Sequence, residues 1–160
     1  MRSETRAGRE VRMQRAGSLL VALSIAIAFP AAPKSSFEVA LQDFELLGTW
    51  APDCSEPPSP IHPHATYTIP SSGQGSMTYD AGSRSPGSAY TILSAERISD
   101  DKLLLREEWL HDHSRLEVTV RKFRGKVKVW LSRDADGKLL VKDGVVVATG
   151  YVSPWMMRCP

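Results

Sequence analysis

From Ala89 onward, apolar and polar residues alternate, and turn-forming residues recur every eight to twelve positions. Successive side chains of a β-strand point to opposite faces, so a period of two predicts strands with one buried face. The clearest example is 114–123, whose inward face would be formed by Leu116, Val118 and Val120. Short connections such as Arg124-Gly125 force neighbouring strands to run antiparallel. The pattern therefore predicts an all-β fold built as an antiparallel meander.

Closure of this meander into a barrel follows from the number of strands. Further strands are predicted at 90–95, 102–110 and 126–132, on both sides of the turn at 142–144, and at 49–51 and 65–69, which makes about eight. A closed sheet has no exposed edges, and eight strands leave an interior that side chains fill or that holds one small ligand. The Pro-rich stretch 51–64 and the Gly- and Ser-rich stretch 71–88 are predicted as loops or edges. We therefore expect one small barrel over 34–160.

An export signal is predicted at 1–33. Five arginines fall within the first fifteen residues, and the run 18–29 follows without any charge. Twelve helical residues rise about 18 Å, which is short of the roughly 30 Å that a membrane-spanning helix must cross. Ala26-Ile27-Ala28 fits the small-residue pattern of a signal-peptidase site. We expect a cleaved signal peptide, with Met13 as an alternative start, and a periplasmic or secreted product without a stable membrane anchor.

The net charge of +2 belongs to this leader and not to the expected domain. Residues 34–160 hold 15 basic and 16 acidic residues, so the balance gives no argument for binding nucleic acid. A local basic stripe is formed by Arg121, Lys122, Arg124, Lys126 and Lys128. We interpret it as a solvated face, with an acidic partner as the alternative.

Two cysteines remain, Cys54 near the start of the expected domain and Cys159 at its end. In an oxidising compartment they should form a disulfide, which would close a loop of 105 residues and stabilise the fold by about 4 to 5 kcal/mol. The first and last strands of a closed barrel are neighbours, so closure would bring the two residues within reach. Buried free thiols are the alternative, and a zinc site is disfavoured because no Cys-x-x-Cys spacing occurs.

The run Gly48-Thr49-Trp50, after a short helix-like segment at 37–47, resembles the opening of the lipocalin and wider calycin barrels. The resemblance implies a lipocalin-like barrel in which Gly48 and Trp50 close the base and Arg158 joins Trp50 through a cation–π and hydrogen-bonded contact. The second lipocalin signature, a Thr-Asp-x-x turn, is missing, so no ligand is implied. The longer string GTWAPDC at 48–54 is similar to a group of small exported bacterial proteins of unassigned function.

All four histidines lie in two His-x-His pairs, formed by His62 with His64 and by His111 with His113. On an extended chain, residues i and i+2 point the same way, so each pair can present two imidazoles to one metal. Four such nitrogens suit tetrahedral zinc or a copper site. Both pairs fall in predicted loops, where exposed histidines are ordinary, so metal binding is the lesser alternative.

No catalytic motif is found: there is no Gly-x-Ser-x-Gly and no cysteine left unpaired by the expected disulfide. Glu107 and Glu108 are adjacent in a strand, so they face opposite sides and cannot flank one bond; we interpret them as surface charge. No catalytic residue and no cofactor is therefore predicted.

Three functions are compatible with these features. The preferred one is an exported β-barrel binding protein whose lumen or Pro-rich mouth takes an unknown small apolar ligand. The first alternative is a secreted inhibitor or protein-interaction module, of the protease- or lysozyme-inhibitor kind, that acts on an exported protein partner. The second is a metal-binding protein that uses the histidines. An apolar lumen would favour the first function, and a packed interior with a rigid exposed loop at 52–64 would favour the inhibitor.

Overall fold

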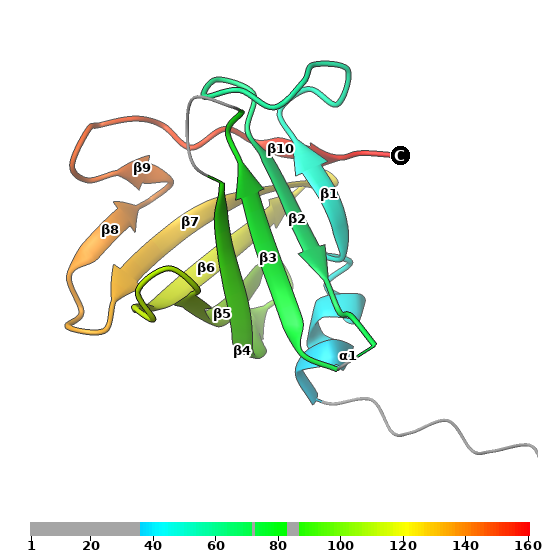
Figure 1. Cartoon of the computed structure of the whole chain (residues 1–160), viewed down its shortest axis with the longest axis vertical. Coiled ribbons are helices and arrows are strands. Elements are labelled where there is room, and N and C mark those ends of the chain that lie inside the picture. Colours follow the sequence, from blue (N-terminus) through cyan, green and yellow to red (C-terminus); the bar gives the residue numbers. More distant parts are fainter. Residues whose placement is uncertain (1–35, 72, 83–86) are drawn as a thin grey trace, which may run out of the picture. The chain divides into compact units, whose positions relative to one another are not determined.

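The computed structural model describes residues 36–71, 73–82 and 87–160. The expected signal peptide at 1–33, with Met13, lies outside these ranges. The described chain holds one short helix and ten strands (Figure 1). Their order is α1 (Ser36–Asp43), β1 (Gly48–Ala51), β2 (His64–Thr68), β3 (Gly75–Asp80), β4 (Ser88–Ser99), β5 (Lys102–Trp109), β6 (Arg115–Phe123), β7 (Lys126–Asp134), β8 (Leu139–Lys142), β9 (Val145–Val146) and β10 (Met156–Arg158). The one described helix has eight residues, and no helix in the described ranges has the length and hydropathy of a membrane span.

Eight of these strands close into an antiparallel barrel, as the alternation of the sequence predicts. Strands β1 to β7 pair in chain order, and β10 completes the ring by pairing with β1 on one side and with β7 on the other. β8 and β9 continue the sheet beyond β7, outside the ring. Figure 1 shows β1 to β4 side by side and β5 to β7 crossing behind them. The core lies between these two halves.

Strand β4 connects the two halves because it is long and bent. It has twelve residues, and its register with β5 shifts between Ile92 and Ser94 and again between Arg97 and Ser99. An extra residue in one strand of an antiparallel pair bends that strand and increases its twist. The first part of β4, residues 88–92, therefore pairs with β3, and residues 90–99 pair with β5.

Strand β3 corrects the expectation that 71–88 forms loops or edges. Residues 76–80 pair with β2 and residues 75–79 pair with the start of β4, so β3 is an interior strand of the barrel. Gly75 lies in a tightly packed place: a Cβ there would stand 3.1 Å from the ring of Phe37 and 3.2 Å from Ile92. The glycine at the start of β3 is thus accounted for by α1, which packs closely against the strand.

The core is one apolar cluster, and α1 with the turn after it covers one of its sides. Leu41, Phe44 and Leu46 are buried there. Lys122 holds this turn in place by donating to the carbonyl oxygen of Phe44 at 3.2 Å and to the carboxylate of Glu45. The other buried apolar members of the cluster are Trp50, Ala65, Tyr67, Ile92, Leu103, Leu105, Val118, Val120, Val127 and Met156.

The expected basic stripe does not form a row of free cations. Arg121 pairs with Asp101 at 2.9 Å, and Lys122 binds the turn after α1. Lys128 is buried, although alternation places it on the outer side of β7. The segment after β8 folds back over it: the N–H of Gly144 donates to the carbonyl oxygen of Trp130 at 2.8 Å. A distant part of the chain therefore covers a side chain that would otherwise be solvated.

Candidate functional site

An apolar cavity of about 190 Å³ lies where β7 separates from β10. The two strands pair only at the start of β7, through Lys126 and Val127, whereas the end of β7 pairs with β8. Between these two pairings the wall of the barrel is completed by the chain leading to β10. The cavity is lined by Pro63, Ala65, Tyr67, Met77, Tyr79, Val127, Lys128, Val129, Val146, Tyr151, Ser153, Pro154 and Met156.

The period of two in the strands explains this lining. Ala65 and Tyr67 alternate on β2, and each is paired in register with a cavity residue of β3, Tyr79 and Met77 respectively. Val127 and Val129 stand on the same face of β7. The segment 146–156, which we call the cover segment, supplies Val146, Tyr151, Ser153, Pro154 and Met156. The cavity is therefore built from the barrel interior and one covering segment.

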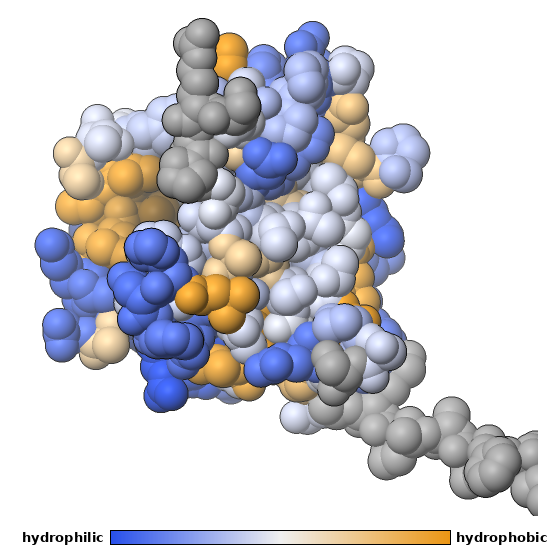
Figure 2. All heavy atoms as spheres, viewed as in Figure 1, coloured by the Kyte–Doolittle hydropathy of each residue, from blue (hydrophilic) through white to orange (hydrophobic). Residues whose placement is uncertain are grey.

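The outer side of the cover segment is also apolar. Val147, Tyr151 and Val152 are exposed there, close in sequence to the strands β8 and β9. Figure 2 shows apolar residues gathered over the part of the surface where β8 and β9 lie in Figure 1. Tyr151 belongs to both sides, since it is exposed and also lines the cavity.

Glu107 lies inside the barrel and not on its surface. It shares the inward face of β5 with Leu103 and Leu105, and only 1% of it is exposed. Its Oε1 has no hydrogen-bond partner among the described residues. Burial raises the pKa of this carboxyl to about 7. The interpretation of Glu107 as surface charge is therefore wrong, whereas Glu108 is on the outer side and binds His113 and Arg115.

Two tyrosines lie near this carboxyl. Burial raises the pKa of the Tyr67 phenol, and the charge of Glu107 raises it further. Burial is also the main cause that raises the pKa of Tyr90, and Glu107 again contributes. The ring of Tyr90 stacks on that of Trp109, its cross-strand partner on β5, at a centroid distance of 6.4 Å. Tyr67 thus both lines the cavity and stands within the electrostatic reach of Glu107.

The signal for this site is present in the sequence. Residues 103, 105 and 107 have the same parity on a strand, so two buried leucines place the third side chain inside. Composition argues the opposite, because glutamate is almost never fully buried without a partner. At this position the alternation of side chains along the strand predicts burial correctly, and the residue type does not.

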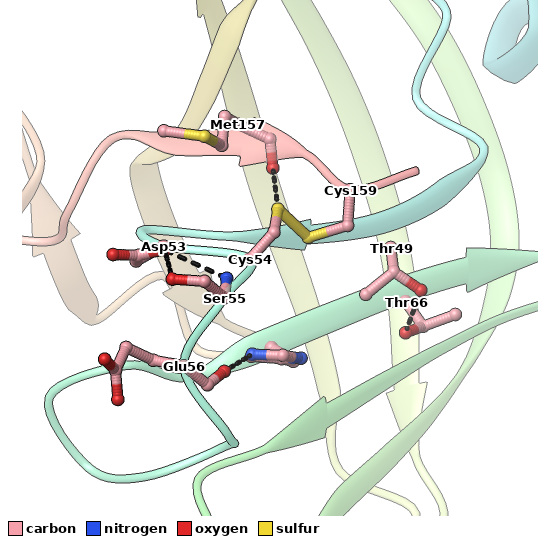
Figure 3. The surroundings of a disulfide bond; sticks show 9 residues. Thr49, Asp53, Cys54, Ser55, Glu56, Thr66, Met157 and Cys159 are labelled. Carbon is pink, nitrogen blue, oxygen red and sulfur yellow. Dashed lines mark hydrogen bonds between the residues drawn. A yellow bond between two sulfur atoms is a disulfide. The ribbon is translucent and has the colours of Figure 1, made fainter.

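The disulfide predicted between Cys54 and Cys159 is present (Figure 3). The two Cα atoms are 5.5 Å apart, and the N–H of Cys159 donates to the carbonyl oxygen of Thr49 at 2.8 Å. The loop that follows is ordered by Asp53, whose carboxylate accepts from the N–H and the hydroxyl of Ser55. The bond ties the end of β1 to the end of β10, and it indicates an oxidising, non-cytoplasmic environment.

Trp50 and Arg158 are direct partners in the register of β1 and β10. Trp50 is buried, and its indole N–H donates to the carbonyl oxygen of Leu46 at 2.7 Å. The guanidinium of Arg158 packs over Gly48, where a Cβ would stand 3.1 Å from its Nε. The cation–π contact expected between Arg158 and Trp50 is not among those that the described residues make. Arg158 instead contacts Gly48, and the indole N–H of Trp50 is hydrogen-bonded by the turn that precedes β1.

The histidines do not form the metal site considered from the sequence. His64 contacts the carbonyl oxygen of Glu56 through Nε2 at 3.1 Å, whereas His113 contacts Glu108 through Nδ1 at 3.0 Å. His111 packs against the ring of Trp109, and Nδ1 of His62 is buried. Within the described ranges, no group of three or more His, Cys, Asp or Glu side chains is arranged to hold a metal ion.

The two cysteines predicted to pair are joined in the structure, and Gly48, Trp50 and Arg158 lie together. The two histidine pairs share no site among the described residues. Comparisons with protein-family models, with curated proteins and with solved structures find no match to this chain.

Proposed function

We propose that this protein is an exported β-barrel that binds a small apolar ligand in the cavity between β2, β3, β7 and the cover segment. The apolar lining of that cavity is the observation that carries the proposal. Sites for drug-sized ligands usually measure roughly 300 to 1,000 Å³. An apolar cavity of about 150 Å³ holds benzene. A cavity of about 190 Å³ is therefore suited to a ligand with a body of about one ring.

The proposed location is the periplasm or the extracellular medium. The disulfide supports it, since such bonds persist in oxidising compartments and are rare in the cytosol. The charged, then apolar, N-terminal sequence supports it independently. The N-terminus of protein recovered from the periplasm or the medium should lie between residues 29 and 34, and an uncut N-terminus on the exported protein would contradict the proposed cleavage.

Ligand binding can be tested with toluene, a neutral one-ring probe, by following backbone amide shifts in NMR. Saturable shifts are expected at Tyr67 and Val129 and not at α1. Ala65→Phe should fill the cavity and abolish the shifts, and Val129→Phe should do the same from the opposite wall. Thr68→Phe, on the exposed end of the same strand as Ala65, is the matched control and should leave binding unchanged. Binding that survives both filling variants would contradict the proposed site.

A second function, protein interaction through the loop at 52–63, is favoured by one observation. Ile61 is 72% exposed, yet its loop is held by the disulfide and by reciprocal backbone hydrogen bonds between Ser59 and His62. A rigid loop that presents an apolar side chain is the form expected of an inhibitor. A partner captured from the periplasm should be lost with Ile61→Asp and kept with Leu110→Asp, because Leu110 is exposed on another loop.

A further inference from the structure

A buried cation without a counter-charge lies in the wall of the cavity. Lys128 is one of the lining residues, and only 7% of it is exposed. Among the described residues its ammonium makes no ion pair, and its contacts are with the rings of Trp130 and Trp155. Burying a charge without an opposite charge destabilises a fold, and an apolar residue would complete the same wall. A lysine at this position therefore points to an anion that comes from outside the chain.

The charge that faces Lys128 from the neighbouring strand is also positive. Arg121 of β6 is its register partner, and the two cations share the ring of Trp130, at 4.7 Å and 5.9 Å from its centroid. Arg121 is compensated, since Asp101 binds it at 2.9 Å. Asp143, in the turn after β8, is exposed and makes no ion pair with the lysine. The position thus holds one uncompensated positive charge.

The end of the Lys128 side chain lies against the chain that leads into the cover segment. A Cβ on Gly144 would stand 2.5 Å from Nζ, so the ammonium is next to this glycine. The carbonyl oxygen of Gly144 accepts from the N–H of Ser153 at 2.8 Å, and Ser153 lines the cavity. The ring of Trp155, 5.3 Å from the ammonium, belongs to a residue between two others of the lining. The ammonium and the apolar wall are therefore held by the same short stretch of chain.

We propose that Lys128 binds the carboxylate of the ligand, so that the protein takes a small apolar acid in its ionised form. This inference rests on the proposed function and specifies its ligand class. The ammonium of Lys128 donates to a carboxylate oxygen, and the apolar body, of about one ring, lies against the lining residues Tyr67 and Met77. The contact supplies the negative charge that the described residues do not bring to the lysine.

Other ligand classes fit this arrangement less well. An amine would bring another positive charge beside Lys128 and Arg121, and like charges repel strongly in a buried site. A neutral ring would leave the ammonium with only the faces of two tryptophans. A phosphate monoester carries up to two negative charges, whereas one cation is uncompensated. A carboxylate matches that single charge, and hydrogen bonds between ionised groups are roughly twice as strong as neutral ones.

The test compares three probes of nearly equal shape and different charge: benzoate, benzamide and benzamidinium. They are titrated calorimetrically into the disulfide-bonded protein at about pH 6, where carboxylates are ionised and lysines protonated. Benzoate should bind at least about tenfold more tightly than benzamide, and benzamidinium at least about tenfold more weakly. Lys128→Met keeps the length of the side chain without its charge, so it should remove these preferences and leave the affinity for benzamide within about threefold of the wild type. Lys126→Met, at an exposed position on the same side of β7, is the matched control and should keep them.

The outcomes separate this inference from the proposed function. If toluene binds but benzoate binds no more tightly than benzamide, the acid site is overturned and the binding function stands. A preference for benzoate that persists in Lys128→Met would overturn the acid site as well. Failure of toluene and of all three charged and neutral probes would overturn both proposals.

A measurement on the wild type does not depend on the folding of any variant. The side-chain Cε resonance of Lys128, followed by NMR, should shift saturably with benzoate, and that of Lys126 should not. An unchanged Lys128 resonance while benzoate binds would place the carboxylate elsewhere and overturn the acid site.

Discussion

Gly144 lies directly against the buried side chain of Lys128: a Cβ on Gly144 would stand 2.5 Å from Nζ of the lysine and would overlap its Cε. The ammonium of Lys128 is also placed over the rings of Trp130 and Trp155, at 5.9 Å and 5.3 Å from their centroids. Burial lowers the pKa of this lysine, and Arg121 lowers it further. The contact fixes the chain after β8 against β7, beside the wall of the cavity.

Gly144→Ala should therefore destabilise the protein more than its backbone conformation alone predicts. Gly144 and Gly150 both have positive φ, +77° and +71°, but a Cβ on Gly150 would meet nothing within 4 Å. Gly150→Ala should cost about 1 to 2 kcal/mol of unfolding free energy in urea. Gly144→Ala should cost about 0.5 to 1 kcal/mol more, because the flexible end of the Lys128 side chain must move to another rotamer. Adding Lys128→Ala should reduce this extra loss. Equal effects of the two glycine changes would contradict the contact.

Glu107 should make stability fall as the pH rises from about 4.5 to about 7. Its pKa in the folded state is about 7, above the ordinary value of 4.5, so in this range the folded state keeps a proton that the unfolded state has lost. The loss should approach about 3 kcal/mol and level off above that range. The facing phenols of Tyr67 and Tyr90 stay neutral throughout, since their pKa values are raised.

The same comparison in Glu107→Gln isolates this effect. The variant should lack that part of the pH dependence and should be more stable than the wild type at about pH 8, where the wild type carries a buried negative charge. Urea unfolding at several pH values measures both. A variant that is less stable than the wild type at every pH would show that Glu107 has a stabilising partner in the folded protein.

Removal of the disulfide should weaken the fold strongly. The bond closes 105 residues, and in the chain-entropy model its loss costs about 4 to 5 kcal/mol. Replacing both Cys54 and Cys159 by serine should lower the unfolding free energy by this amount, and chemical reduction of the wild type should give the same result. A loss below about 1 kcal/mol would mean that the unfolded state is not constrained by the bond.

Trp50→Phe should cost about 1 to 3 kcal/mol, because it removes the indole N–H that satisfies the buried carbonyl of Leu46. Trp109→Phe is the comparison, since a phenylalanine there keeps an aromatic ring opposite Tyr90 and should cost less. Thermal or urea unfolding measures both changes. A smaller loss at position 50 than at position 109 would contradict the role given to the indole hydrogen bond.

Local sequence determines the strands and, through them, the closure of the barrel. The alternation of apolar and polar residues in 114–123 and 126–132 predicts β6 and β7, because successive side chains of a strand with one buried face point in turn to the core and to solvent. The disulfide follows from closure, since the first and last strands of a closed sheet are neighbours. These features depend on residues close in sequence or on the ends of the chain.

Three features depended on the tertiary structure. β3 is a strand because β2 and β4 satisfy its backbone and Phe37 packs over Gly75, although its composition is typical of a loop. Lys128 is buried because a segment after β8 covers it, and Glu107 is unpaired because the strands around it bring phenols and apolar side chains. Alternation specifies which face a side chain takes. What covers that face is decided by contacts between segments far apart in the sequence, and the cavity arises only from those contacts.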